Sequence, residues 1–292
     1  MKEAVQLAIG GAPAIGARAS ATLTELLASS GVQVVRTGSI VLEWPNTALP
    51  FDPAAWSADL PAAADPLAFA FRHLTGSRSQ DPWATPVDPI RGQVADWLRA
   101  ERLRLMPPWP SGVSCAVALV HEAQRFARPR GGLRTRLART SRELPLAPYE
   151  RLAAVERAHR VQSALSSIDL LEPAEQAQAR ALGFVLDTPA GVQIAPRPGF
   201  HRGTAFPARG YDMATERAAE WIELPLLGDT ADPGLTRLIA SGGGAVLGIP
   251  VERFAGEHGE AEALLYDDLL SRLRSLGAWL TTPEQLLRRL LL

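Results

Sequence analysis

The most constraining feature of the chain is an unbroken run of small and apolar residues at 114–120. Such a run is typical of a β-strand that is buried on both faces, as the strands of parallel sheets are. Further strand-like runs then alternate with segments of helical period. The runs lie at 161–167, 184–186, 221–227, 245–249 and 278–281, and the helical segments at 149–160, 172–182, 232–241, 260–276 and 283–291. This alternation predicts a parallel α/β sheet or barrel, with a loop at 188–213.

The beginning of the chain predicts a small α/β domain of its own. Asp65 suits the N-cap of a helix, and Pro66 suits its first turn, where a missing N–H costs no hydrogen bond. The prolines at 107, 108 and 110 cannot continue a helix. They mark the predicted boundary between a domain at 1–112 and a domain at 113–292. Within the first domain, helices are expected at 21–29, 65–74 and 90–106, and strands at 32–36 and 39–44.

Charge and cysteine content exclude several classes of protein. The net charge of -1 gives the chain no bulk attraction to nucleic acid. Cys115 is the only cysteine, so neither an intrachain disulfide nor a thiolate-rich zinc site is possible. No stretch reaches the roughly 18 apolar residues of a membrane span, and no secretory signal is expected. We therefore expect a cytoplasmic protein that is not an integral membrane protein and does not bind nucleic acid.

Two polar residues end the first strand of the predicted sheet. They are His121 and Glu122, directly after the apolar run. Because ligands of α/β folds bind at the carboxyl ends of the strands, the pair could bind a metal or transfer protons there. The alternative is a strand that simply ends in polar residues.

Several segments are similar to polysaccharide deacetylases (carbohydrate esterase family four). Residues 116–126 resemble the first strand motif of that family, Leu-Thr-His-Asp-Val-Asp. Residues 198–212 read Pro-Gly-Phe-His-Arg-Gly-Thr-Ala-Phe-Pro-Ala-Arg-Gly-Tyr-Asp. They resemble Pro-Gly-Phe-Arg-Ala-Gly-Thr-Cys-(Phe/His)-Pro-Phe-Arg-Pro-Phe-Asp of a bacterial branch. Further similarity covers 181–188, 222–229 and 277–284. The resemblance implies a distorted (β/α) barrel over about 114–292, preceded by a small α/β domain.

The resemblance also implies a chemistry, the zinc-assisted hydrolysis of an acetyl amide or ester. In the family, one Asp and two His hold the metal, and a second Asp acts as the base. The base falls on Glu122, which keeps a carboxylate. The metal positions fall on Gln124, Ser163 and Ala147 or its neighbour, and a late catalytic His falls on Ile249. These residues are poor zinc ligands, so neither a metal nor another cofactor is expected.

The predicted site combines the strand end with the other matched segments. Its catalytic candidates are Glu122, His121 and Asp229. Its ligand-binding candidates are Gln124, Ser163, Asp187, His201, Arg202, Arg209 and Asp212. His159 lies on a predicted helix and is expected at the surface. A separate segment at 125–142 contains seven arginines, which could bind the phosphate of a sugar phosphate or simply be solvated.

Three functions remain open from the sequence. The first is a protein of bacterial surface-glycan biosynthesis that lacks zinc-dependent activity. It would bind a carbohydrate, a sugar phosphate or a protein partner through the former active-site cleft. The second is an active, metal-independent hydrolase that uses Glu122 with His121 or His201. The third is an assembly subunit that pairs with an active homologue or forms a homo-oligomer.

Overall fold

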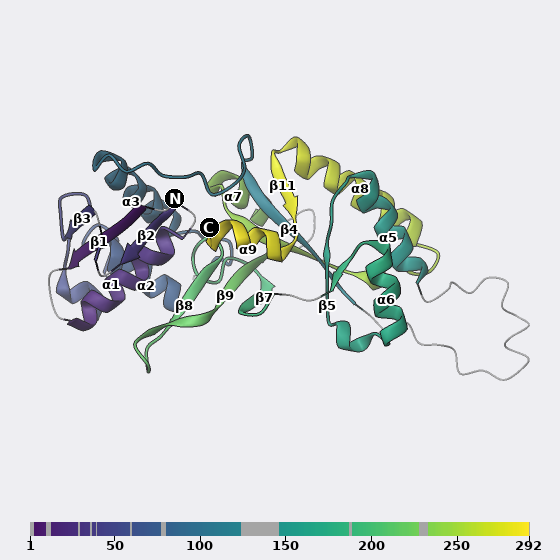
Figure 1. Ribbon diagram of the computed structural model, residues 1–292, viewed down its shortest axis with the longest axis horizontal. Helices are drawn as coiled ribbons and strands as arrows, with labels where there is room; N and C mark the ends of the chain where they lie inside the picture. Colours follow the sequence, from purple (N-terminus) through teal and green to yellow (C-terminus); the bar gives the residue numbers. More distant parts are fainter. Residues whose placement is uncertain are drawn as a thin grey trace, which may run out of the picture.

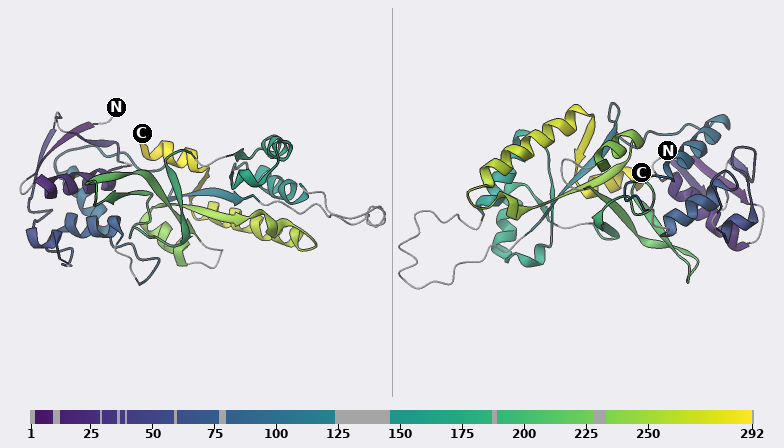
Figure 2. Two further views of the ribbon diagram at one scale, coloured as in Figure 1. Left: turned by 90° about the horizontal axis from the view of Figure 1, so that it is seen from below. Right: turned by 180° about the vertical axis from the view of Figure 1, so that it is seen from behind.

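The computed structural model describes most of the chain as a mixed α/β protein. The described residues are 3–9, 13–28, 30–35, 37–38, 40–58, 60–76, 80–123, 146–186, 189–227 and 233–291. In Figure 1 a small sheet with its helices lies at one end of the molecule, and a larger sheet crosses the middle. The two views of Figure 2 show the same sequence of parts along the long axis. Within the described residues, no helix has both the length and the apolar character needed to cross a membrane.

The small sheet has three parallel strands in the order β2-β1-β3. They are β1 (Glu3–Ile9), β2 (Val32–Val35) and β3 (Ile40–Trp44), and helix α1 (Pro13–Leu26) connects the first two. The link from β2 to β3 crosses β1 at Gly38, where a Cβ atom would lie 2.8 Å from both Ala4 O and Gln6 N. Only glycine permits that approach. The sequence predicted β2 and β3, but it missed β1 and placed the start of α1 too late.

Two further helices complete the first part of the chain, together with a short 3-10 helix, η1 (Pro53–Trp56). Helix α2 (Pro66–Thr75) begins as predicted, with Asp65 Oδ1 accepting from Ala68 N at 3.0 Å. Asp65 is fully buried, and its other oxygen accepts from Trp56 Nε1 at 2.7 Å. Burial raises the pKa of Asp65, although these hydrogen bonds oppose the shift. Helix α3 (Asp88–Ala100) ends before the predicted residue 106.

The large sheet has eight strands and is mostly parallel. Its main path is β6-β5-β4-β10-β9-β7; β11 also pairs with β4, and β8 pairs antiparallel with β9. The strands are β4 (Cys115–Glu122), β5 (Ala164–Ser166), β6 (Val185–Leu186), β7 (Val192–Pro198), β8 (Ala208–Asp212), β9 (Arg217–Leu227), β10 (Gly244–Pro250) and β11 (Ala278–Thr281). The predicted loop at 188–213 is therefore wrong, because it contains β7 and β8. The predicted α/β class is confirmed.

Helices pack on both faces of this sheet. They are α5 (Ala147–Ala158), α6 (Pro173–Leu182), α7 (Pro233–Ser241), α8 (Gly259–Ser275) and α9 (Pro283–Leu291), with short helices η3 (Ile168–Leu170) and η4 (Val251–Phe254). The prediction for α9 is confirmed, and those for α6, α7 and α8 agree to within a residue or two. Figure 1 shows α5, α6 and α8 together at the end of the molecule far from the small sheet.

Strand β4 is buried on both faces, as its apolar run predicts. Cys115, Val117 and Leu119 pack into one hydrophobic cluster with residues of α5, α6, α7 and α8. Ala116, Ala118 and Val120 pack into a second cluster with Trp109 and leucines of α9. The strand thus separates a helix-covered face from a second face that α9 and Trp109 cover.

The buried thiol of Cys115 provides a measurable probe of this core. Cys115 is 0 % exposed, and burial raises the pKa of its thiol to about 11. The thiolate is the reactive form, so we expect the folded protein to resist a disulfide reagent such as dithionitrobenzoate at pH 8. In urea, one thiol per chain should react. Rapid stoichiometric labelling of the folded protein would contradict this placement of β4.

Candidate functional site

The predicted catalytic pair at the end of β4 points to opposite faces of the sheet. Side chains alternate along a strand, so His121 follows Val117 and Leu119 onto the helix-covered face, whereas Glu122 follows Ala118 and Val120. His121 is 0 % exposed, but Glu122 is exposed. The two neighbours in sequence therefore do not form one catalytic pair.

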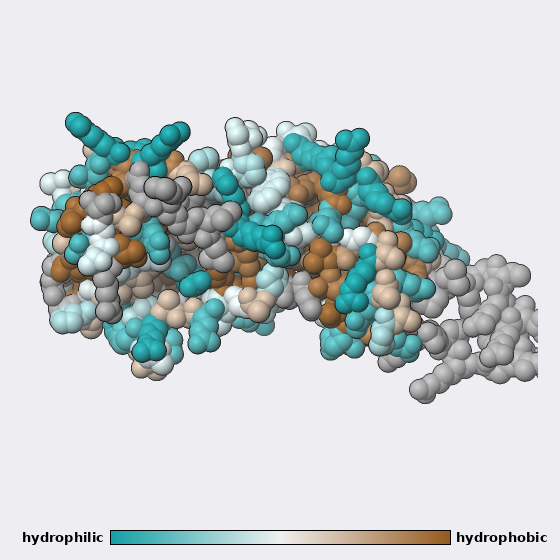
Figure 3. Space-filling view, viewed as in Figure 1, coloured by the Kyte–Doolittle hydropathy of each residue, from teal (hydrophilic) through white to brown (hydrophobic). Residues whose placement is uncertain are grey.

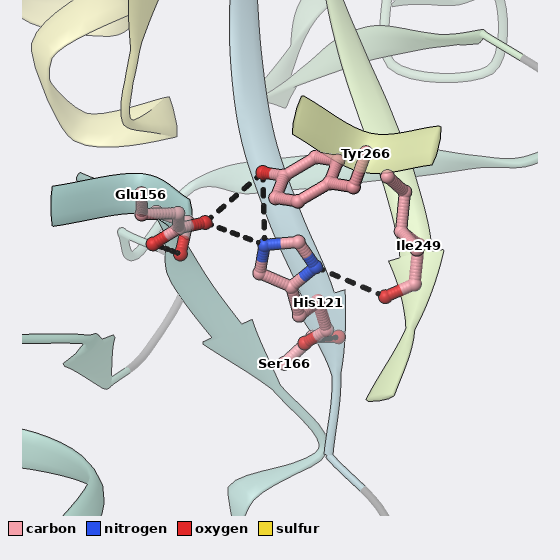
Figure 4. A network of polar contacts seen from close by, with 6 residues as sticks. His121, Glu156, Ser166, Ile249 and Tyr266 are labelled. Carbon is pink, nitrogen blue, oxygen red and sulfur yellow. Dashed lines mark hydrogen bonds and ion pairs between the residues drawn. The ribbon is translucent and has the colours of Figure 1, made fainter. Parts of the chain in front are cut away.

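His121 belongs to a closed network of buried polar groups (Figure 4). Its Nδ1 lies 3.1 Å from Ile249 O on β10, and its Nε2 lies 2.8 Å from Glu156 Oε1 on α5. The hydroxyl of Tyr266, on α8, donates to the same Glu156 oxygen at 3.0 Å. Ser163 Oγ donates to Glu156 Oε2 at 2.8 Å. Both ring nitrogens of His121 are therefore occupied by atoms of the protein.

The hydrogen bonds fix the proton count of this network. Nδ1 of His121 must carry a hydrogen, because the Ile249 carbonyl can only accept. A second proton must lie between Nε2 and Glu156 Oε1, since an unprotonated ring nitrogen would repel a carboxylate. Burial, with the charge of Glu156 in second place, raises the pKa of Tyr266 well above its usual range, so this hydroxyl remains a donor. Both ring nitrogens of His121 are thus engaged within the protein, and neither is free to bind a metal.

The sequence identified two members of this network and missed two. His121 and Ser163 were predicted as site residues, and the structure brings them to the same carboxylate. Glu156 and Tyr266 were not singled out. A signal for Glu156 was present, because Tyr149, Leu152 and Ala153 precede it at the i, i+3, i+4, i+7 spacing of a buried helix face. A carboxylate at the last of these positions needs a buried partner.

The histidine at the C-cap of α5 is also more buried than expected. His159, predicted at the surface, is only 9 % exposed. Its Nε2 lies 2.8 Å from Asp267 Oδ1 of α8, whose side chain is half exposed. This pair joins the end of α5 to α8. It is a packing contact rather than part of the predicted site.

Glu122 has different neighbours, at the exposed carboxyl end of the face that α9 and Trp109 cover. In the parallel register it lies between Ser166 of β5 and Pro250 of β10. Strands β4, β5 and β10 thus bring three of the segments singled out in the sequence to one edge. Ser166, half exposed, was not predicted and carries the hydroxyl nearest in register to Glu122. The Ser166 hydroxyl donates to His121 O at 3.4 Å, so Glu122 is left as the exposed acceptor for a polar ligand at this edge.

The predicted ligand-binding residues after Gly199 lie elsewhere. Their segment meets the start of β10, where Gly244 N donates to Ala205 O at 2.9 Å. Ile249 lies five residues farther along that strand, about 16 Å away at the usual rise. The segment from Gly199 to Phe206 therefore does not join His121 or Glu122.

Three residues of that part of the chain are occupied by structural contacts. Arg202 donates to Leu74 O of α2 at 2.6 Å and lies 3.4 Å from Glu223 of β9. The backbone N–H of Arg209 donates to Glu25 of α1 at 2.9 Å. His201 donates from Nε2 to Arg197 O at 2.8 Å. Arg202 and Arg209 thus connect the large sheet to helices of the first part of the chain.

Of the four remaining candidates, Asp212 lies in a turn and the other three lie outside the described residues. Exposed Asp212 accepts from Thr215 Oγ1 and Ala214 N, both at 2.8 Å, and these bonds lower its pKa. It stabilises the turn between β8 and β9. Gln124, Asp187 and Asp229 lie outside the described residues, and so does the whole of the arginine-rich segment 125–142.

Among the described residues, no three His, Cys, Asp or Glu side chains gather in a way that could hold a metal ion. Because Gln124 and Asp229 are not included, the expected loss of zinc stays a prediction.

No protein-family model matches the chain, and no curated protein or solved structure shows significant similarity to it. The resemblance to polysaccharide deacetylases therefore rests on the sequence motifs alone.

Proposed function

We propose that the chain is a divergent, deacetylase-like protein with a distorted (β/α) barrel that binds a glycan at the carboxyl edge of the large sheet. On this proposal it acts in the cytoplasm in surface-glycan biosynthesis and lacks zinc-dependent hydrolysis. The glycan comes from the sequence resemblance. The place of binding is supported by β4, β5 and β10, whose carboxyl ends are neighbours at Glu122.

One observation supports the proposed loss of zinc-dependent hydrolysis. His121, beside the inherited base position, is buried and has both nitrogens bonded within the protein. Ser163, at an inherited histidine position, is also 0 % exposed and bonded to Glu156. Among the catalytic candidates that the structure describes, Glu122 is the one with an exposed side chain. A single carboxylate can hold a sugar hydroxyl, but acid–base hydrolysis of a sugar derivative ordinarily needs a second proton-transfer group or a metal.

The proposal predicts binding without turnover. With N-acetylated chitotetraose as the probe, we expect heat of binding in calorimetry and no release of acetate, with or without added Zn²⁺. Replacing Glu122 by Gln removes a charged acceptor and should weaken binding about tenfold. The matched control is Glu257→Gln, which changes an exposed glutamate before α8 and should leave the affinity unchanged.

Two results would replace this proposal with one of the alternatives. Acetate release that Glu122→Gln abolishes would establish an active hydrolase. Absence of glycan binding, together with a stable dimer in sedimentation, would favour an assembly subunit.

An assembly subunit would need an exposed apolar surface, and the adjacent leucines 264 and 265 on α8 are 72 % and 61 % exposed. On the face shown in Figure 3, however, hydrophobic and hydrophilic residues are interspersed, and no single apolar patch dominates the described residues of that face.

A further inference from the structure

A cavity of about 190 Å³ lies where the first part of the chain meets the large sheet. Residues of helix α1 and strand β2 line it, together with residues of β8, β9 and α9. Its apolar wall includes Val32, Ile222 and Leu290, all at most 8 % exposed. An apolar cavity of about 150 Å³ can hold benzene, so this one has room for a single six-membered ring.

Two charged residues line this partly apolar space, together with the polar side chains of Thr24 and Gln33. Glu25 and Arg209 both line the cavity. Within the described residues, the Glu25 carboxylate accepts one hydrogen bond, from the backbone N–H of Arg209 at 2.9 Å. A carboxylate offers about four acceptor positions, so most of its capacity remains available. Gln33 adds an amide at the edge of the cavity.

The electrostatics of the cavity select against a charged ligand. Burial raises the pKa of Glu25, while the charges of Arg209, Arg91 and Arg202 act in the opposite direction. A cation in the cavity would meet the guanidinium of Arg209, which lines it. An anion would meet the Glu25 carboxylate. An uncharged hydroxyl suits both neighbours, since it can donate to a carboxylate and accept from a guanidinium.

We propose that this cavity binds an uncharged cyclic alcohol, with its hydroxyl between Glu25 and Arg209 and its ring against Val32, Ile222 and Leu290. Pockets for small molecules are usually mostly apolar, with a few converging polar groups, and often lie where two parts of a chain meet. The cavity is separate from the edge at Glu122, so this inference goes beyond the proposed function and does not depend on it.

A series of probes with the same ring tests which charge the cavity prefers. Cyclohexanol, cyclohexylammonium and cyclohexanecarboxylate share one ring and differ in charge. In saturation-transfer NMR at pH 7, we expect saturable binding of cyclohexanol and much weaker signals from the two ions. Preference for either ion, or no saturable binding of cyclohexanol, would overturn the proposal.

Two variants and one control locate the binding. Glu25→Gln removes the charged acceptor and should weaken cyclohexanol binding about tenfold. Ala28→Leu, at the cavity wall, occupies the space and should abolish binding. Glu257→Gln should bind as the unchanged protein does. Circular dichroism melting of each variant confirms that it is folded. Binding that persists in both folded variants would place the ligand elsewhere and contradict the assignment.

Discussion

Replacing Glu156 by alanine should destabilise the protein by about 3–5 kcal/mol, the cost of removing one partner from a buried ionic or hydrogen-bonded pair. The change leaves His121 Nε2, Ser163 Oγ and the Tyr266 hydroxyl without their shared acceptor in a core that excludes water. Urea unfolding followed by circular dichroism measures the loss.

A conservative variant separates the proton requirement from simple packing. In Glu156→Gln an amide nitrogen at the Oε1 position can donate to His121 Nε2 and to the Tyr266 oxygen, and the amide oxygen at the Oε2 position can still accept from Ser163. The expected loss is therefore only about 1–2 kcal/mol. Glu150→Ala, at an exposed position on the same helix, should cost about 0.5 kcal/mol. Equal losses for Glu156→Ala and Glu150→Ala would show that the network does not form as described.

Substituting alanine for Gly243 should also destabilise the fold strongly, by about 3 kcal/mol. Its Cβ atom would lie 2.2 Å from Ala205 O, a backbone atom that cannot move without displacing the segment before β8. The same segment supplies the carbonyl that Gly244 N binds. Thermal unfolding should show the loss as a lower melting temperature.

A second glycine gives the opposite sign and serves as the control. Gly92 lies within helix α3, and a Cβ atom there would meet nothing within 4 Å. Alanine lowers the entropy of the unfolded chain and favours the helix, so Gly92→Ala should stabilise the protein by about 0.5–1 kcal/mol. If Gly243→Ala proved as harmless as Gly92→Ala, the close contact with Ala205 would be wrong.

Local sequence patterns predicted the structure correctly where the residues of one short stretch determine it. The apolar run of β4 predicted its double burial, and Asp65 with Pro66 predicted the start of α2. Gly183, at φ +108°, ends α6 as expected. In each case a short stretch contains the whole physical reason, either continuous apolarity or a cap.

Sequence patterns did not predict the structure where it is determined by contacts between residues far apart in the chain. Strand β1 is stabilised by β2 and β3 on its two edges, and β8 by pairing with β9, neither of which has a clear local signal. For the candidate site, the motif placed His121 and Glu122 together, but the alternation of a strand separates them. Whether His121 faces a helix or an open edge depends on Glu156 and Tyr266, which lie on two other elements of the chain.

The edge of β4 that two strands share has a consequence for the order of folding during synthesis. β5 covers only the carboxyl half of that edge, and the amino half pairs with β11, from Ala278 to Thr281. The small sheet uses only residues 3–44 and can close early. The amino half of β4 exposes an unpaired edge until residues 278–281 have left the ribosome, and such an edge invites association with other chains. A nascent chain halted just before β11 should therefore depend more on chaperones than one that includes it.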